Sequence, residues 1–519
     1  MTSGSAARAR WHDGTVAEPL LDPTGIAQLR EALTRARYTT PGIADRLGPE
    51  ATTAVSRGDY RQALRLTAGR DALATLIRLY VCGTTEPVEA VAAALAPLPL
   101  AQARAAGLVE PHGEGLRAGV DLEAYGDGWW VVSDLPASAR PGRPLPADHV
   151  LGVGGASTTL VGATIRRPVA TALDLGTGCG VQALHLATHA GAVTATDLNP
   201  RALRFAATTA ALSGQRWELR RGDLAAPVAG RRFDLVVSNP PFVVGPGTAT
   251  HTYRDSGRAG DAVSQELAAL APELLTEGGV MQYLANWAHV AGEDWRERVA
   301  GWFAGTGCDA WVIQREVSDP LAYVRLWLDD TGQPRAAAEA WLDWFDAARI
   351  EAVGFGLVTV RRGGHDQPVV RVEDLRQQVE PPVGAQIAAW FDRQDWLRDR
   401  DPAALLAEPY RAADGLTLRQ EATLEPDGWR VARQFLTMAH GLRWTEEVDP
   451  LVVSLVAAAD GEIPARAQLA VLAASSDVSE EALAEQAAPV IAHLVERGLL
   501  LPAGGTPTAG PPGAPGRAP

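Results

Sequence analysis

The sequence predicts an α/β protein whose centre is a seven-stranded, mainly parallel sheet, flanked by N- and C-terminal winged-helix-like accessory domains. Strand-like apolar runs alternate with helical stretches between about residues 147 and 364, as in sheets built from βαβ units. A glycine-rich turn follows the first of these strands, at the position where such sheets bind ligands. Helices followed by a hairpin precede the central region, and a hairpin followed by helices comes after it.

Composition limits the classes of protein to which the chain can belong. Its 519 residues suggest two to four domains, and 46% hydrophobic with 21% charged residues is ordinary for globular proteins. We find no signal peptide and no apolar run of the ~20 residues that a membrane span needs. Three cysteines make neither a disulfide framework nor a zinc site, and the net charge of −15 disfavours a surface built to attract phosphate. These features predict a cytoplasmic protein with no membrane partner and no metal.

The N-terminal part divides into a flexible segment, residues 1–22, and a helical, winged-helix-like accessory domain, residues 23–140. From Val88 to Val132 the pattern reads as helix, turn, helix and hairpin, ending in Trp129-Trp130-Val131-Val132. Such modules bind DNA in some proteins and dock other proteins elsewhere, so the pattern leaves both roles open. Prolines and glycine in Pro141–Pro146 indicate a linker to the next domain.

The central domain, residues 147–364, holds the seven predicted strands. They are Ala172–Leu175, Val193–Asp197, Trp217–Arg220, Phe233–Ser238, Val280–Ala285, Ala310–Gln314 and Phe355–Arg361. The C-terminal accessory domain, residues 366–502, is α+β and winged-helix-like, with a hairpin turning at Asp427-Gly428 before three helices. Residues 503–519 are mostly Pro, Gly and Ala and are predicted to form a disordered tail.

The glycine-rich turn runs from the strand end at Asp174 through Gly176, Thr177, Gly178 and Cys179 to Gly180. Glycines there permit positive φ angles and let a ligand lie against bare backbone. A glycine-rich turn alone also suits a dinucleotide. The spacing of the glycines, at every second residue, departs from the dinucleotide pattern.

Two downstream acids extend the site. Asp197 ends the next strand, where a carboxylate can accept both hydroxyls of a ribose, and Asp223 follows the third strand. The region from about 148 to 362 therefore resembles class I S-adenosylmethionine-dependent methyltransferases, whose sheet is Rossmann-like. The resemblance implies that S-adenosyl-L-methionine is the cofactor and that the glycine turn holds its methionine part. It also implies that Asp197 binds ribose, that Leu198 packs on adenine, and that Asp223 caps the base. Residues 152–159 correspond to a segment that such enzymes often lay over the cofactor.

The fourth predicted strand runs into Asn239-Pro240-Pro241-Phe242. The two prolines lack N–H donors and fix φ, so the backbone carbonyls here can turn towards an amino group of the substrate. Asn239 supplies another acceptor and Phe242 a ring to stack on a flat group. Together they would hold a planar NH2 nitrogen in line with the methyl group, which is catalysis by positioning.

This tetrapeptide resembles the NPPF motif of release-factor glutamine N5-methyltransferases and of rRNA guanine-N2 and tRNA adenine-N6 methyltransferases. The resemblance implies a protein or RNA partner, and we expect first a protein glutamine amide of the release-factor type. Three alternatives stay open: a nucleobase amine, a small molecule, and a regulator that binds the cofactor without catalysis. The accessory domains would bind protein or nucleic acid. Tyr253, Arg254 and Asp255 would either contact substrate or form a salt-bridged loop.

Overall fold

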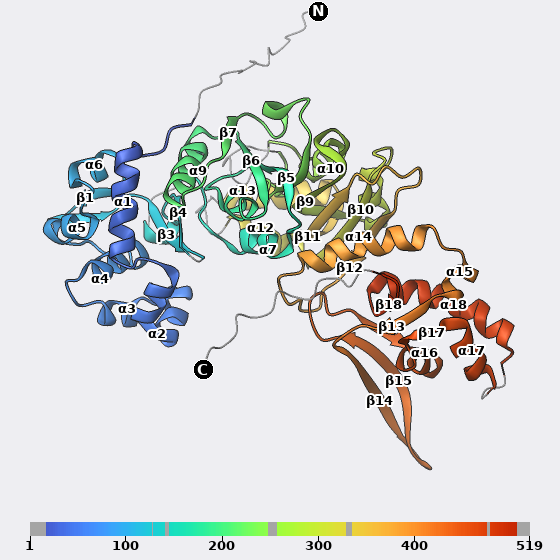
Figure 1. Cartoon of the computed structure of the whole chain (residues 1–519). Coiled ribbons are helices and arrows are strands. Elements are labelled where there is room, and N and C mark those ends of the chain that lie inside the picture. The colour runs from blue at the N-terminus through green and yellow to red at the C-terminus, as the bar shows by residue number, and fades with distance from the viewer. Residues whose placement is uncertain are drawn as a thin grey trace, which may run out of the picture. The chain divides into compact units, whose positions relative to one another are not determined.

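The computed structural model describes residues 17–126, 128–140, 145–247, 257–328, 335–474 and 478–505 (Figure 1). The chain divides into two compact units. Unit 1 contains residues 1–160 and 167–375, and unit 2 contains residues 161–166 and 376–519. Most of the predicted flexible N-terminus and C-terminal tail, residues 1–16 and 506–519, lies outside the described residues.

Unit 1 begins with a helical module and two hairpins. The helices are α1 (Pro23–Arg35), α2 (Thr40–Ser56), α3 (Arg61–Leu66), α4 (Ala72–Leu76), the π-helix η1 (Ile77–Val81), α5 (Val88–Leu95) and α6 (Leu100–Ala105). The hairpins are β1 (Val109–His112) with β2 (Gly115–Ala118), and β3 (Asp121–Tyr125) with β4 (Trp129–Ser133). The predicted order of helix, helix and hairpin is present as α5, α6 and two hairpins, of which the second contains the aromatic run, whereas the winged-helix assignment stays a prediction.

The β3–β4 hairpin joins this module to the helix α9 (Pro200–Leu212) that covers the sheet. The backbone N–H of Val132 donates to Thr209 Oγ1 at 3.1 Å, and that of Trp130 to Ser213 Oγ at 3.3 Å. The Trp130 indole N–H donates to the carbonyl oxygen of Tyr38 at 2.8 Å. The aromatic run noted in the sequence is therefore an internal joint between the helical module and the sheet.

The central sheet of unit 1 has eight strands in the order β12-β10-β11-β9-β8-β5-β6-β7. Their bounds are β5 (Val169–Leu175), β6 (Ala190–Asp197), β7 (Glu218–Arg221), β8 (Phe233–Ser238), β9 (Leu275–Val290), β10 (Asp309–Ser318), β11 (Ile350–Arg361) and β12 (Val370–Asp374). The run from β7 to β9 is parallel, β11 is antiparallel to both of its neighbours, and β12 is parallel to β10. All seven predicted strands are present, but the predicted count of seven is wrong by one because β12 lies beyond residue 364.

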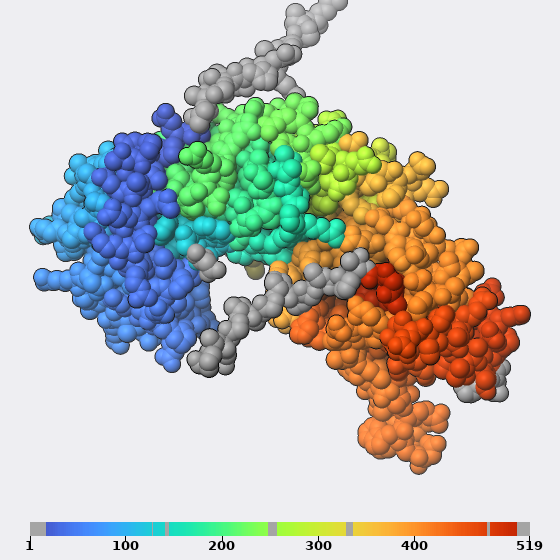
Figure 2. Space-filling model, in the orientation of Figure 1, coloured from blue at the N-terminus to red at the C-terminus, as the bar shows by residue number. Residues whose placement is uncertain are grey.

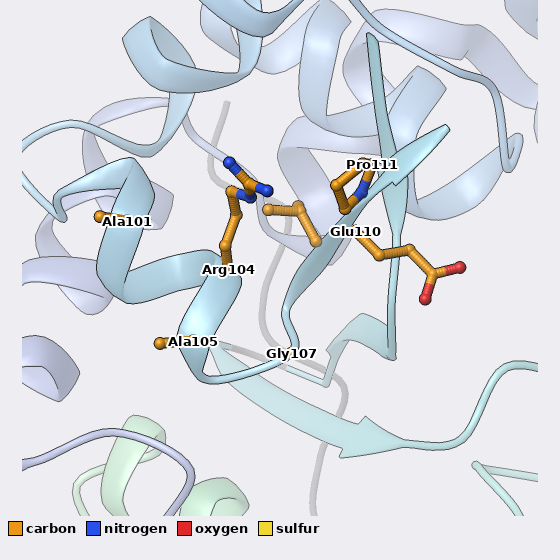
Figure 3. A pocket seen from close by; sticks show the side chains of 7 residues that line it. Ala101, Arg104, Ala105, Gly107, Glu110 and Pro111 are labelled. Carbon is orange, nitrogen blue, oxygen red and sulfur yellow. The ribbon is translucent and has the colours of Figure 1, made fainter. Parts of the chain in front are cut away.

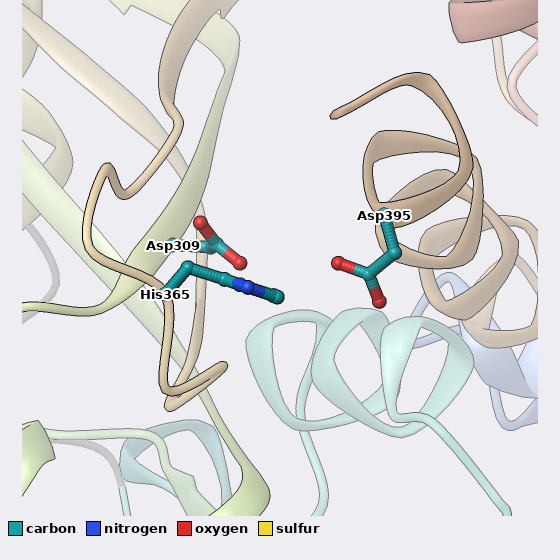
Figure 4. Close-up of side chains that lie close together, drawn as sticks. All are labelled: Asp309, His365 and Asp395. Atoms are coloured by element: carbon teal, nitrogen blue, oxygen red, sulfur yellow. The ribbon is translucent and has the colours of Figure 1, made fainter. Parts of the chain in front are cut away.

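The eighth strand is fixed by a buried acid at the start of β10. Asp309 is 1% exposed, forms an ion pair with Arg361 at 2.8 Å, and accepts the backbone N–H of Val369 at 2.8 Å. Figure 4 shows Asp309 on β10 with His365 in the loop that follows β11. The carboxylate therefore connects β10, β11 and the residue that leads into β12, a long-range interaction that the local apolar pattern does not signal.

Helices precede the first strand of the sheet, β5, or lie between its later strands in the sequence (Figure 1). They are α7 (Gly155–Ala163), α8 (Val181–Leu186), α9, α10 (Ala262–Leu274), α11 (Trp295–Ala300), α12 (Pro320–Leu328) and α13 (Arg335–Ala347), with short 3₁₀ turns η2 (Ala137–Ala139), η3 (Ala226–Val228) and η4 (Gly301–Phe303). The core between β8, β9, β10 and α10 is closed by Trp287, Trp302 and Phe303. Within the described ranges, no helix is long and apolar enough to cross a membrane.

Unit 2 combines two three-stranded sheets with a helical core. Its helices are α14 (Gly384–Arg398), α15 (Pro402–Ala407), α16 (Pro450–Ala457), α17 (Ala465–Ala474) and α18 (Glu480–Arg497). One sheet has the order β17-β13-β18, with β13 (Pro409–Ala412), β17 (Asp460–Pro464) and β18 (Leu500–Pro502). The other is β14 (Leu416–Glu425), β15 (Gly428–Met438) and β16 (Thr445–Val448). Ile491 and Leu494 of α18 lie in the centre of the core.

The predicted hairpin at Asp427-Gly428 is present as a long ribbon made by β14 and β15. Figure 2 shows the ribbon standing out from the rest of unit 2. Leu424 and Trp429 pair across the strands near its tip and are 69% and 74% exposed. Charged side chains are also present on the ribbon, including Arg433 of β15, which forms an ion pair with Glu447 of β16.

Candidate functional site

The glycine turn follows β5 and leads into α8, as the sequence predicts. Gly176, Gly178 and Gly180 have φ angles of 73°, 55° and 90°, a region that side chains other than glycine rarely adopt. A Cβ atom built on Gly176 or Gly178 would meet nothing within 4 Å, whereas one on Gly180 would lie 2.7 Å from the Trp217 ring. The first two glycines therefore border open space against bare backbone, and the third allows close packing.

Asp174 lies under this turn and is fully buried. Its Oδ2 accepts the Thr177 hydroxyl at 2.6 Å and the backbone N–H of Ala183 at 3.2 Å. Its Oδ1 is also buried and has no hydrogen-bond partner among the described residues. Burial raises the pKa of this carboxyl from 3.8 to about 7. A buried acceptor without a donor costs free energy, so this oxygen suits a ligand that brings a donor into the turn.

Asp197 ends β6 beside the turn. Its Oδ2 accepts the backbone N–H of Gly178 at 2.9 Å and its Oδ1 accepts that of Asn199 at 2.8 Å. Burial raises its pKa. Each carboxylate oxygen keeps a further lone pair for a ribose hydroxyl. The adjacent Leu198 is 51% exposed, so it offers an apolar surface to a flat base. Open backbone, an orphaned carboxylate oxygen and a second carboxylate fit an S-adenosylmethionine molecule.

Asp223 follows β7, close to the same edge of the sheet. The neighbouring Gly222 N–H donates to the carbonyl oxygen of Asp197 at 3.0 Å, which ties the two loops together. The Asp223 carboxylate is exposed and forms an ion pair with Arg258 at 3.0 Å. Arg258 also binds Glu266, at 2.6 Å. Asp223, which was predicted to cap adenine, is thus paired with Arg258, a few residues before α10.

The predicted acceptor loop begins at the end of β8. Ser238 Oγ donates to the carbonyl oxygen of Leu175 at 2.8 Å, which joins the ends of β8 and β5. Asn239 to Phe242 therefore start beside the glycine turn. Asn239 is half-buried, Pro240 is buried, and Phe242 is half-buried with its ring 6.2 Å from that of Trp327 at an interplanar angle of 74°. The structure brings the predicted cofactor residues and the predicted acceptor loop to one edge of the sheet.

Two residues of this edge were missed from the sequence. Tyr323 and Trp327 lie one helical turn apart on α12, between β10 and β11. Trp327 contacts Phe242 of the acceptor loop, and Tyr323 binds the backbone of Val244 just after it. The spacing of four residues between Tyr323 and Trp327 indicates that they share one face of a helix. Nothing in the local sequence, however, indicates which strand end that face covers. Tyr253, Arg254 and Asp255, which were expected near the substrate, lie outside the described residues.

Cys179 in the turn and His185 on α8 are packed against their neighbours and take no part in the chemistry we expect here. Cys179 is 5% exposed, and burial raises the pKa of its thiol to about 12, so it stays protonated and unreactive. His185 on α8 lies with Nε2 2.9 Å from the Tyr125 hydroxyl and contacts Trp129 edge-on. Both observations agree with packing roles rather than acid–base chemistry.

A separate hollow of about 510 Å³ lies between α6 and β1 (Figure 3). Its lining is Ala101, Arg104, Ala105, Gly107, Val109, Glu110 and Pro111. None of these residues belongs to the glycine turn or to the acceptor loop. We therefore assign the hollow to the N-terminal module and not to the cofactor.

The fold and this edge define the class of the central domain, a methyltransferase domain. Residues 153–293 match the family model described as "Methyltransferase small domain", which confirms the predicted class and, with it, S-adenosylmethionine as the cofactor of such a domain. Residues 35–119 and 388–502 match two models described as domains of unknown function, DUF7059 and DUF7782.

The curated relatives match part of the chain. A "Release factor glutamine methyltransferase" of Cereibacter sphaeroides is 40% identical over 119 residues, which are 22% of this chain and 36% of the relative. A "Ribosomal RNA small subunit methyltransferase C" of Alcanivorax borkumensis is 35% identical over 114 residues, 22% of this chain and 31% of the relative. The chain thus spans about a third of the length of these relatives. A solved methyltransferase from Pyrococcus furiosus is 16% identical with a TM-score of 0.27, covering 44% of this chain and 92% of that one.

Proposed function

We propose that the chain is an S-adenosylmethionine-dependent N-methyltransferase that acts on the side-chain amide of a protein glutamine, as release-factor enzymes do. The observation that carries this proposal is the position of Asn239 to Phe242, which start where Ser238 is bonded to the end of the glycine-turn strand. An acceptor loop beside a cofactor turn is the arrangement that direct methyl transfer to nitrogen requires.

The residues of the loop would act by binding and orienting the acceptor. The Asn239 side-chain oxygen and the proline carbonyls accept the two hydrogens of the NH2 group, and Phe242 packs on its flat face. When bound, the cofactor supplies an electrophilic methyl group. Hydrogen bonds to both amide hydrogens favour the pyramidal nitrogen that develops during attack, so they stabilise the transition state more than the ground state.

A nucleobase amine is the second candidate acceptor. Its support is the similarity to the rRNA methyltransferase named above, together with the Phe242 ring, which would stack equally well on a flipped base. The net charge of −15 favours the protein acceptor, because phosphate contacts need clustered cations. We propose the cytoplasm as the compartment and protein or nucleic-acid binding as the role of the accessory parts.

The test is methyl transfer from labelled cofactor to purified release factors and, in parallel, to ribosomal RNA and transfer RNA. We expect label on a glutamine of a release factor, located by mass spectrometry. The Asn239→Ala variant serves as the control for transfer that does not use the loop. Label confined to RNA would overturn the glutamine assignment and support the nucleobase amine. Absence of label on all of these acceptors would overturn both.

A further inference from the structure

Two helices between β10 and β11, α12 and α13, pack beside the acceptor loop. One apolar cluster unites Val243 and Val244, just after the loop, with Tyr323 and Val324 of α12 and Phe345 of α13. The predicted cofactor residues belong to β5, the turn between β5 and α8, the end of β6 with the residue that follows it, and the loop after β7. The acceptor side of the site is therefore supported by elements distinct from those that would hold the cofactor.

The Tyr323 hydroxyl is the polar centre of this cluster. Tyr323 is fully buried, and its hydroxyl accepts the backbone N–H of Val244 at 2.8 Å. The same hydroxyl accepts the side-chain N–H of Asn286 at 2.9 Å, and Asn286 is 1% exposed on β9. Val244 is fully buried as well, so water cannot replace the tyrosine as the partner of its N–H.

We propose that Tyr323 is a positioning residue for methyl transfer, which fixes the acceptor loop through the backbone of Val244, and that Trp327 supports the Phe242 ring against which the acceptor would pack. The inference rests on the proposed function for its kinetic consequences. Val244 is two residues beyond Phe242, so a shift of its backbone moves the ring that would hold the acceptor. Asn286 orients the hydroxyl from the neighbouring strand.

Trp327 completes the arrangement from the same face of α12. Its ring lies 6.2 Å from that of Phe242, edge to face, and 6.2 Å from that of Tyr323. At this separation the two rings are in direct edge-to-face contact, so Trp327 holds the Phe242 ring in place. Tyr323 would thus control where the loop lies, and Trp327 the orientation of its Phe242 ring.

The first test measures the loop directly and needs no acceptor. In Tyr323→Phe, hydrogen exchange at the Val244 amide should rise about tenfold relative to wild type, because its buried N–H has lost its acceptor. Exchange in β5 should stay unchanged. The matched control is Tyr410→Phe in unit 2, which deletes another buried tyrosine hydroxyl, one that donates to the Leu405 carbonyl at 2.8 Å. Unchanged exchange at Val244 in Tyr323→Phe would overturn the positioning role.

The second test separates binding from turnover with the acceptor that the methylation assay identifies. Tyr323→Phe should lower kcat about tenfold and leave the cofactor Kd within about twofold of wild type. Adding Asn286→Leu should lower kcat little further, since both residues act through one hydroxyl.

Trp327→Ala should raise the acceptor KM about tenfold, and Trp327→Phe should bring KM most of the way back to wild type. Equal losses in Tyr410→Phe, or a cofactor Kd that rises as kcat falls, would contradict the proposal. If no acceptor is methylated, the proposed function fails, whereas the exchange at Val244 still decides the role of Tyr323.

Discussion

Asp174→Asn is the substitution that tests the cofactor turn most sharply. It removes the charge of a fully buried carboxylate whose Oδ1 has no partner among the described residues, while an asparagine oxygen can keep the bonds to Thr177 and Ala183. We expect the variant to be more stable than wild type at alkaline pH without cofactor, and to bind S-adenosylmethionine at least about tenfold more weakly, because a charged acceptor has been lost.

The magnitude follows from the pKa of Asp174. Burial raises it from 3.8 in the unfolded chain to about 7 in the folded protein. Because the folded pKa is the higher one, this carboxyl stabilises the fold most below pH 3.8, and that stability is lost as the pH rises through about 7. A rise of about three units in this pKa corresponds to a loss of roughly 4 kcal/mol in the free energy of unfolding by pH 8. Roughly 2.5 kcal/mol of this is lost between pH 5 and pH 8.

The assay is urea denaturation of the cofactor-free protein at pH 5 and pH 8, read by hydrogen exchange of β5 so that unit 1 alone is reported. The new asparagine N–H group adds a cost that does not depend on pH, so it cancels between the two conditions. The stabilisation by Asp174→Asn should therefore be larger at pH 8 than at pH 5 by roughly 2.5 kcal/mol. An equal effect at both pH values would refute the reasoning, as would unimpaired cofactor binding.

Three further predictions concern the remaining site residues. Asn239→Ala should keep the cofactor Kd within about threefold by calorimetry and lower kcat about a hundredfold, because it removes a positioned acceptor; parallel losses of both would contradict its role. Asp223→Ala should weaken cofactor binding about tenfold, whereas Arg258→Ala should not weaken it and should change the free energy of unfolding by at most about 1 kcal/mol, since the Asp223 side chain is exposed and that of Arg258 half-buried. Cys179, with a thiol pKa near 12, should resist iodoacetamide in the folded protein at pH 8, as peptide mass spectrometry can check; rapid labelling would show that the turn is open.

Local patterns were sufficient for the strands and the cofactor turn. The strand from Phe233 to Ser238 is an apolar run that ends at two prolines, and the turn from Gly176 to Gly180 follows a strand directly, so both signals lie within a few residues. The hairpin at Asp427-Gly428 is equally local, and it is present. Such features depend on the backbone preferences of neighbouring residues and on the alternation of apolar and polar residues, both of which can be read directly from the sequence.

The features that were missed depend on contacts between distant residues. The strand β12 is held through Asp309, whose partners Arg361 and Val369 lie more than fifty residues away in sequence. Likewise, the hydroxyl of Tyr323 binds the Val244 backbone 79 residues away. No periodicity marks either interaction, because each satisfies a buried polar group whose partner is chosen by the tertiary fold.

The β14–β15 ribbon has a practical consequence for engineering the chain. Its tip between Glu425 and Gly428 contributes little to any core, and Trp429 beside it is 74% exposed. An epitope or a fluorophore-binding peptide inserted after Pro426 would extend a hairpin without disturbing the helices of unit 2. The tip of the ribbon is thus a site at which the protein could be tagged for capture or labelling. It lies far along the sequence from the cofactor turn.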